Sequence, residues 1–171
     1  MIVYGSEYES AQRYAEYMGY RLAEAVHSYK ERFKSYERIL YIGSLYNNTV
    51  TGLDWFFRRN QGFRDFYLIT VGIFPPTPEE RESRFALLQG QIPEEHYDPG
   101  KIFFLPGKLN PGKLKLEHKM IYRGMKNQLL SLDTRRQSQE YFLAHYGQIV
   151  DGYDESQADF FVEFFKKLKE Q

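Results

Sequence analysis

The sequence predicts an α/β fold in which helices cover both faces of a parallel β-sheet. Short runs of consecutive apolar residues, typical of strands buried on both faces, alternate with segments whose apolar residues recur at helical spacing. Each run ends in a short loop containing Gly, Ser, Thr or Asn. In open α/β sheets such loops, at the carboxyl ends of the strands, form the ligand crevice. We therefore expect any binding site in the loops at residues 5–12, 43–52 and 70–76.

The first half of the chain supplies three predicted strands and two predicted helices. Strands are expected at residues 2–4, briefly at 24–28, and at 39–42, where Gly43 stops the run. The first helix shows one apolar face, formed by Ala11, Tyr14, Ala15, Met18 and Leu22. The second is expected at residues 53–58.

The second half continues the alternation. Buried strands are expected at residues 66–71 and 102–105, and a short one at 149–150. Thr77, Pro78 and Glu80 form a helix start with a capping box, so that helix runs to about Gln89. Further helices are expected at about 116–130 and 135–146. The last one is capped by Asp154, with Gln157 three residues on, and its apolar stripe is Phe161, Phe164, Phe165 and Leu168.

Composition narrows the class of protein. A chain of 171 residues is long enough for one core and too short for two, so residues 1–171 are expected to form a single domain. Its formal net charge of zero gives no reason to expect nucleic-acid binding. With no cysteine, disulfides, thiolate nucleophiles and thiolate metal sites are excluded. The start has no basic leader, and no apolar run approaches the length of a membrane span, so a cytoplasmic location is expected.

Familiar catalytic motifs are missing. The four histidines have no metal-ligand spacing, and neither a nucleophile elbow nor a P-loop occurs. We therefore predict no metal site and no catalytic acid, base or nucleophile. The first loop is a better candidate, because a strand-to-helix turn offers free backbone amides and a positive dipole end to an anion. Ser6 and Ser10 add hydroxyl donors.

Five segments, taken in order and spacing, resemble a known family. They are Gly5–Gln12 followed by Tyr14-Ala15-Glu16, Tyr36, the run from Ile39 to Tyr46, Thr70-Val71-Gly72-Ile73, and the stretch from Pro106 to Met120. Together they resemble the bacterial flavodoxin-domain proteins, which are related to the menaquinone-dependent protoporphyrinogen oxidases. The resemblance implies an α/β flavodoxin-like three-layer sandwich with a five-stranded parallel sheet in the order 2-1-3-4-5.

The resemblance also implies flavin mononucleotide (FMN) as cofactor, and electron transfer or flavin-dependent oxidoreduction as function. The phosphate would be held by Ser6, Ser10 and the amides of Tyr8, Glu9, Ser10, Ala11 and Gln12. The flavin ring would be flanked on one side by Leu45, Tyr46, Asn47, Asn48 and Thr49, and on the other by Val71, Gly72, Ile73 and Phe74. Tyr46 or Phe74 would stack on the ring. The expected partner is a redox protein or a quinone-like acceptor.

The first loop also departs from the family pattern. Glu9 stands where a Gly is common and Ala11 where a Thr is common, and Glu7 adds a second carboxylate near the expected phosphate. Each change weakens phosphate binding, through like-charge repulsion or a lost hydrogen bond. Two alternatives therefore stay open. One is an interaction module with a degenerate flavin site, and the other is a protoporphyrinogen- or quinone-linked oxidase.

The segment from Lys108 to Lys126 is basic and carries Leu116, Met120 and Ile121 at helical spacing. The plainer interpretation is a helix packed on the domain with its lysines in water. The alternative is a basic amphipathic helix that makes a weak contact with an anionic membrane surface, or that docks an acidic redox partner.

Overall fold

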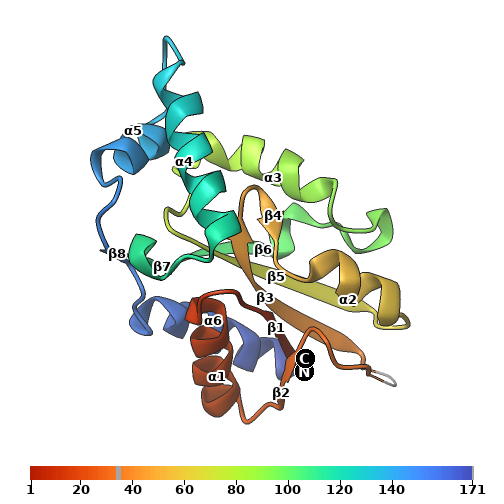
Figure 1. Ribbon diagram of the computed structural model, residues 1–171. Coiled ribbons are helices and arrows are strands. Elements are labelled where there is room, and N and C mark those ends of the chain that lie inside the picture. Colours follow the sequence, from red (N-terminus) through yellow and green to blue (C-terminus); the bar gives the residue numbers. More distant parts are fainter. Residues whose placement is uncertain (34–35, 171) are drawn as a thin grey trace.

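A five-stranded parallel sheet forms the centre of the molecule, in the order β2-β1-β3-β5-β6 (Figure 1). The computed structural model describes residues 1–33 and 36–170. The strands are β1 (Ile2–Gly5), β2 (Val26–Ser28), β3 (Arg38–Tyr46), β5 (Asp65–Gly72) and β6 (Ile102–Pro106). Numbered along the chain, this is the predicted order 2-1-3-4-5, so the expected flavodoxin-like three-layer fold is confirmed.

Helices cover both faces of the sheet. They are α1 (Ser10–Leu22) and α6 (Ser156–Lys169) on one face, and α2 (Leu53–Arg59) and α3 (Arg81–Gln89) on the other. The alternation of side chains along β3 explains the two layers: Leu40 and Ile42 pack with α1 and α6, whereas Ile39 and Tyr41 pack with α2 and α3. The continuous apolar run at 39–42 is therefore buried on both sides, as predicted.

The prediction of five strands missed a sixth. β3 does not stop at Gly43 but continues to Tyr46, and β4 (Thr49–Val50) folds back antiparallel against its end. Gly43 permits this hairpin, because a Cβ there would come within 2.3 Å of the Val50 side chain. The turn is made by Asn47 and Asn48, at φ values of 46° and 62°. Asparagine tolerates this left-handed region better than most residues.

The remaining elements stand together at the carboxyl end of the sheet. They are α4 (Leu116–Leu130), α5 (Gln137–Ala144) and the two-stranded ribbon of β7 (Lys108–Leu109) and β8 (Val150–Asp151). α4 has the predicted bounds, whereas α5 is shorter than the predicted 135–146 because Arg136 is extended and forms its N-cap. The predicted capping box at Thr77 is present, although Pro78–Glu80 form a 3₁₀ turn before α3. Among the described residues, no helix has the length and apolar character needed to span a bilayer.

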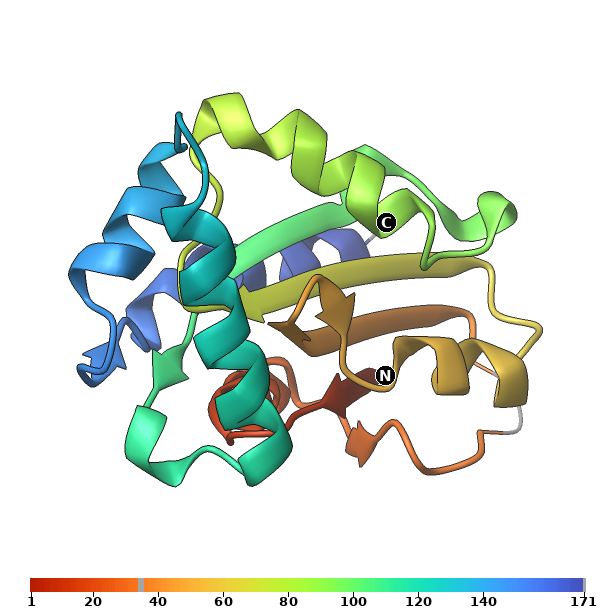
Figure 2. The same ribbon diagram turned by 45° about the horizontal axis from the view of Figure 1, so that its top comes forward.

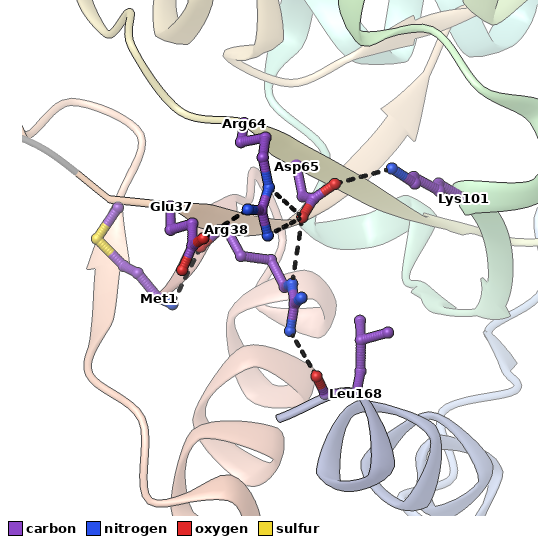
Figure 3. Close-up of polar contacts among 7 residues, drawn as sticks. All are labelled: Met1, Glu37, Arg38, Arg64, Asp65, Lys101 and Leu168. Carbon is purple, nitrogen blue, oxygen red and sulfur yellow. Dashed lines mark hydrogen bonds and ion pairs between the residues drawn. The ribbon is translucent and has the colours of Figure 1, made fainter. Parts of the chain in front are cut away.

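At the opposite, amino edge of the sheet, Asp65 joins three strands through ion pairs (Figure 3). Its carboxylate lies 3.1 Å from Lys101 Nζ, 3.3 Å from Arg64 Nη2 and 3.7 Å from Arg38 Nε. Arg38 in turn donates to the carbonyl of Leu168 in α6, at 2.9 Å. Burial by itself raises the pKa of Asp65, but the hydrogen bonds and charges of Lys101 and Arg64 outweigh it and hold the pKa below its ordinary value.

Replacing Asp65 by Asn tests this cluster. We expect D65N to lower the free energy of unfolding at neutral pH by about 1–2 kcal/mol, because three cations lose their shared anion. A lowered folded-state pKa contributes stability above the unfolded-state pKa, near 4, and loses it as the pH falls through the folded value. Urea unfolding at decreasing pH should therefore show the difference between variant and wild type vanish in acid. The exposed pair of Asp54 with Arg58 provides the control: D54N should change stability by less than about 0.5 kcal/mol.

Candidate functional site

The three predicted loops meet at the carboxyl edge of the sheet. Parallel pairing brings the ends of β1, β3 and β5 side by side, with Gly5 opposite Gly43 and Gly43 opposite Thr70. Figure 2 shows α4 lying across these strand ends, with α5 beside it. The loops expected from the sequence to form a crevice therefore lie side by side, and we call α4, which covers them, the roof.

The first loop leaves the start of α1 open to an anion. Glu9 is the N-cap residue, and no side chain caps the helix. The amide of Ser10 donates to the carbonyl of Tyr8 at 2.9 Å, whereas the amides of Ala11 and Gln12 have no side-chain acceptor among the described residues. The hydroxyl oxygen of Ser6, four residues before the helix, is buried and makes no hydrogen bond within the described part of the chain. A buried hydroxyl without a partner, in the loop that leads to uncapped helix amides, is a feature that an anion would satisfy.

The other residues of this loop have different surroundings. Ser10 is buried, and its hydroxyl oxygen accepts the amide hydrogen of Lys108 at 3.0 Å, which ties β7 to α1. Ala11 is fully buried in the core, so only its backbone faces the loop. Gln12 points along α1 and donates to Glu16 at 2.9 Å. Glu9 is exposed, with φ at 70°, the left-handed region that favours glycine.

The start of α4 closes over the first two loops. His118 lies between two tyrosines. Its Nδ1 is hydrogen-bonded to the hydroxyl of Tyr8, and its ring lies 4.3 Å from that of Tyr46, centroid to centroid. Tyr46 also donates its hydroxyl to the carbonyl of His118 at 2.8 Å. Burial raises the pKa of Tyr46 to about 12, with smaller contributions from Tyr8 and Glu117, so the phenol stays protonated and keeps donating.

A charge pair reinforces this closure. Lys115 Nζ lies 2.9 Å from the carboxylate of Glu7, and the amide of Lys115 donates to the Tyr8 hydroxyl at 3.2 Å. The carboxylate of Glu7, which the sequence marked as a handicap for phosphate binding, is therefore matched by a cation. His118 and Lys115 were not predicted as site residues, because their contacts join segments about a hundred residues apart in the chain.

The second and third loops point to different neighbours. Leu45 packs on the core and Thr49 is exposed on β4, whereas the carbonyl of Asn48 accepts a hydrogen bond from Gln91 at 2.8 Å. Val71 is buried beneath the sheet edge. Gly72 ends β5, and its carbonyl accepts from the amide of Gly107 at 2.6 Å. Of the two predicted stacking residues, Tyr46 therefore contacts the roof, whereas Phe74 lies in a separate cleft.

This cleft, of about 450 Å³, begins at Ile73 and Phe74. Its opposite wall is formed by α5 and residues 149–152. The ring of Tyr141 meets Phe74 edge-on, with centroids 4.6 Å apart, and stacks on His145 at 3.9 Å. Three flat side chains, Phe74, Tyr141 and His145, thus contribute to the lining, which suits a flat apolar ring.

Glu80 holds this wall in place. Its buried carboxylate accepts a hydrogen bond from the Ser138 hydroxyl at 2.5 Å and from the Thr77 amide at 3.2 Å. Burial raises its pKa, but the hydrogen bonds from Ser138 and Thr77 outweigh it and hold the pKa below the ordinary value. The same carboxylate therefore closes the predicted capping box and fixes the start of α5. The sequence indicated only the first of these roles.

The strand order and the crevice at the carboxyl edge define a protein of the flavodoxin-like α/β class. No protein-family model matches the sequence, and no match is found among the curated proteins. Within the described ranges, no group of three or more His, Asp or Glu side chains is placed to hold a metal ion.

Replacing Glu9 by Gly tests the strain in the first loop. We expect E9G to raise the free energy of unfolding by about 0.5–1 kcal/mol, because glycine adopts a positive φ without steric cost. Urea unfolding measures the change. Ala23, at the other end of α1, has φ at 51° and serves as matched control. A23G should give a similar gain in stability, but only E9G removes a charge beside the first loop. A loss of stability in E9G would contradict the prediction.

Replacing Glu80 by Ala tests the brace between α3 and α5. We expect E80A to lower the free energy of unfolding by about 1–3 kcal/mol, since the Ser138 hydroxyl and two backbone groups lose a charged acceptor. Hydrogen exchange should show the largest loss of protection in α5. The neighbouring Glu79 is exposed, so E79A should leave both measurements unchanged. Equal effects of the two variants would show that Glu80 is not a brace.

Proposed function

We propose that this chain is an FMN-binding flavodoxin-like protein that acts in electron transfer or flavin-dependent oxidoreduction. The observation that carries the proposal is the first loop at the carboxyl edge of the parallel sheet, where the Ser6 hydroxyl oxygen is buried without a partner among the described residues and the start of α1 has no side-chain cap. This is the place and the donor set by which such folds bind a phosphate.

The residues present fit the phosphate end of FMN. Ser6 and the amides of the first turn of α1 would donate to the phosphate. Glu7 is paired with Lys115 and Glu9 is exposed, so their charges oppose the phosphate less than the sequence suggested. The hairpin at 45–49 and the loop at 71–74 would flank the ring. Bound flavin would supply one- and two-electron redox chemistry, while the chain positions it and excludes water.

Binding of the flavin ring requires a side chain of the roof to move. His118 lies against Tyr46, so a flat ring reaches the face of Tyr46 only when the His118 side chain turns away. The contacts of the roof with the loops beneath it are mainly side-chain contacts, through Tyr8, Tyr46 and Lys115. Such contacts can exchange without unfolding the helix behind them.

The cleft beside Phe74 supports the oxidoreductase form of this proposal. It opens next to the third flavin loop, and Tyr141 and His145 offer stacked flat surfaces. A quinone-like acceptor, or another flat apolar substrate, would bind there next to the flavin.

One observation favours the second candidate, an interaction module without a flavin. The side chains of Tyr8, His118 and Tyr46 contact one another across the crevice and fill the space beside the predicted stacking residue. A crevice filled by the chain itself needs no ligand for its stability.

Titration of the purified protein with FMN distinguishes a flavin-binding protein from an interaction module. We expect binding at or below tens of micromolar, seen as quenched flavin fluorescence. Replacing Ser6 by Ala should weaken binding by about tenfold or more, because a hydrogen bond to a charged group is lost. Ser131, whose hydroxyl donates within its own turn, provides the control S131A, which should bind as wild type does. Absence of binding at tens of micromolar would favour the interaction module.

Replacing His118 by Ala tests the roof. If FMN must displace the imidazole, H118A should bind FMN several-fold more tightly than wild type, because the displacement no longer has to be made. His27 lies on β2 at the sheet edge, and H27A should leave the affinity unchanged. Stopped-flow fluorescence gives the association rate, which should rise in H118A. Weaker binding in H118A would instead show that the imidazole contacts the ligand directly.

A further inference from the structure

α4 carries apolar side chains on two sides. On its inner side Tyr122 is buried, and Met125 and Leu129 pack against the small core formed with α5. On its outer side Leu116 is 77% exposed and Met120 is 69% exposed, one helical turn apart. The inner residues account for the packing of the helix on the molecule, but they do not explain why the outer pair, Leu116 and Met120, is apolar and exposed.

Cations surround the outer pair. Between residues 108 and 126 the chain has six Lys or Arg residues and one carboxylate, Glu117, although its overall net charge is zero. Three of the six have partners within the molecule: Lys108 pairs with Asp151, Lys115 pairs with Glu7, and Lys126 lies over the ring of Tyr146. The other three, Lys113, Lys119 and Arg123, make no ion pair with any described residue.

These cations share a surface with the apolar pair. Residues 116, 119, 120 and 123 follow the spacing of one helical face, and Lys113 lies in the turn just before the helix. We call Lys113, Leu116, Lys119, Met120 and Arg123 the outer face of α4. It combines unpaired positive charge with exposed aliphatic side chains on one side of a helix.

We propose that the outer face of α4 binds the surface of an anionic lipid membrane. An interfacial helix has this composition, with cations that meet the headgroups and aliphatic side chains that enter the boundary with the acyl chains. A stable protein interface buries about 800 Å² on each partner and commonly relies on buried aromatic anchors, which the outer face lacks. The outer face has two aliphatic residues on one turn, which suits a lipid surface better than a protein partner.

The position of α4 gives this contact a consequence. The helix lies across the carboxyl ends of the strands, so a membrane that contacts its outer face lies close to the crevice (Figure 2). The inference goes beyond the proposed flavin function and does not depend on it, because the outer face is built from residues other than those proposed to hold FMN. A failure to bind FMN therefore leaves the inference intact, and a failure to bind membranes leaves the flavin proposal intact.

Co-sedimentation of the full chain, without added FMN, tests the inference. The probes are vesicles of phosphatidylcholine alone and of phosphatidylcholine mixed with phosphatidylglycerol. We expect binding only to the vesicles that contain phosphatidylglycerol, and release as salt screens the charges. Replacing both Leu116 and Met120 by Glu should abolish binding. Replacing Lys119 and Arg123 by Gln should weaken it by about fivefold for each cation removed.

Phe160 provides the matched control. It is 69% exposed on α6, so F160E replaces an apolar side chain of similar exposure by a carboxylate elsewhere on the molecule. F160E should bind vesicles as wild type does. Circular dichroism of every variant verifies that it is folded. The inference is overturned if wild type fails to sediment with anionic vesicles at low salt, if F160E loses as much binding as the Leu116 and Met120 variant, or if the face captures only an acidic protein.

Discussion

The burial of β3 on both of its faces is the constraint on which the rest of the structure depends. β3 pairs in parallel with β1 on one side and β5 on the other, and its successive side chains enter the two core layers in turn. A shift of register by one residue would exchange the layers, so the pairing is strongly specified. Because parallel strands all end at the same edge, that pairing also brings the loops at residues 5–12, 43–52 and 70–76 together.

The elements after β6 cover this edge of the sheet. They have a small core of their own, made by Leu109, Leu114, Tyr122 and Phe142. The polar contacts that attach it to the main sandwich include these three: the Lys108 amide to Ser10, Lys115 to Glu7, and Ser138 to Glu80. All three are made by residues at or beside the candidate site. The roof is therefore coupled to the site, and a ligand that enters the crevice must compete with the contacts that hold the roof.

Much of the fold was predictable, because burial repeats along the chain with the period of each element. The bounds of α4 and the buried strands followed from local patterns, whereas the strand order followed from the resemblance to the flavodoxin-domain proteins. The hairpin strand β4 did not, since two residues carry no periodicity. In the candidate site, Ser6 and Glu9 could be located from their place after the first strand. His118 and the second role of Glu80 could not, because they depend on partners far away in the chain.

By itself, then, the sequence determined the layers of the sandwich and the edge of the sheet at which the three loops meet. Only the tertiary structure decided which side chains are free there. The Ser6 hydroxyl has no partner among the described residues, whereas the Ser10 hydroxyl oxygen accepts the Lys108 amide, Glu7 pairs with Lys115, and the His118 ring contacts Tyr46. The physical reason is that periodicity reports whether a residue is buried, whereas a hydrogen bond or an ion pair requires two particular groups to meet.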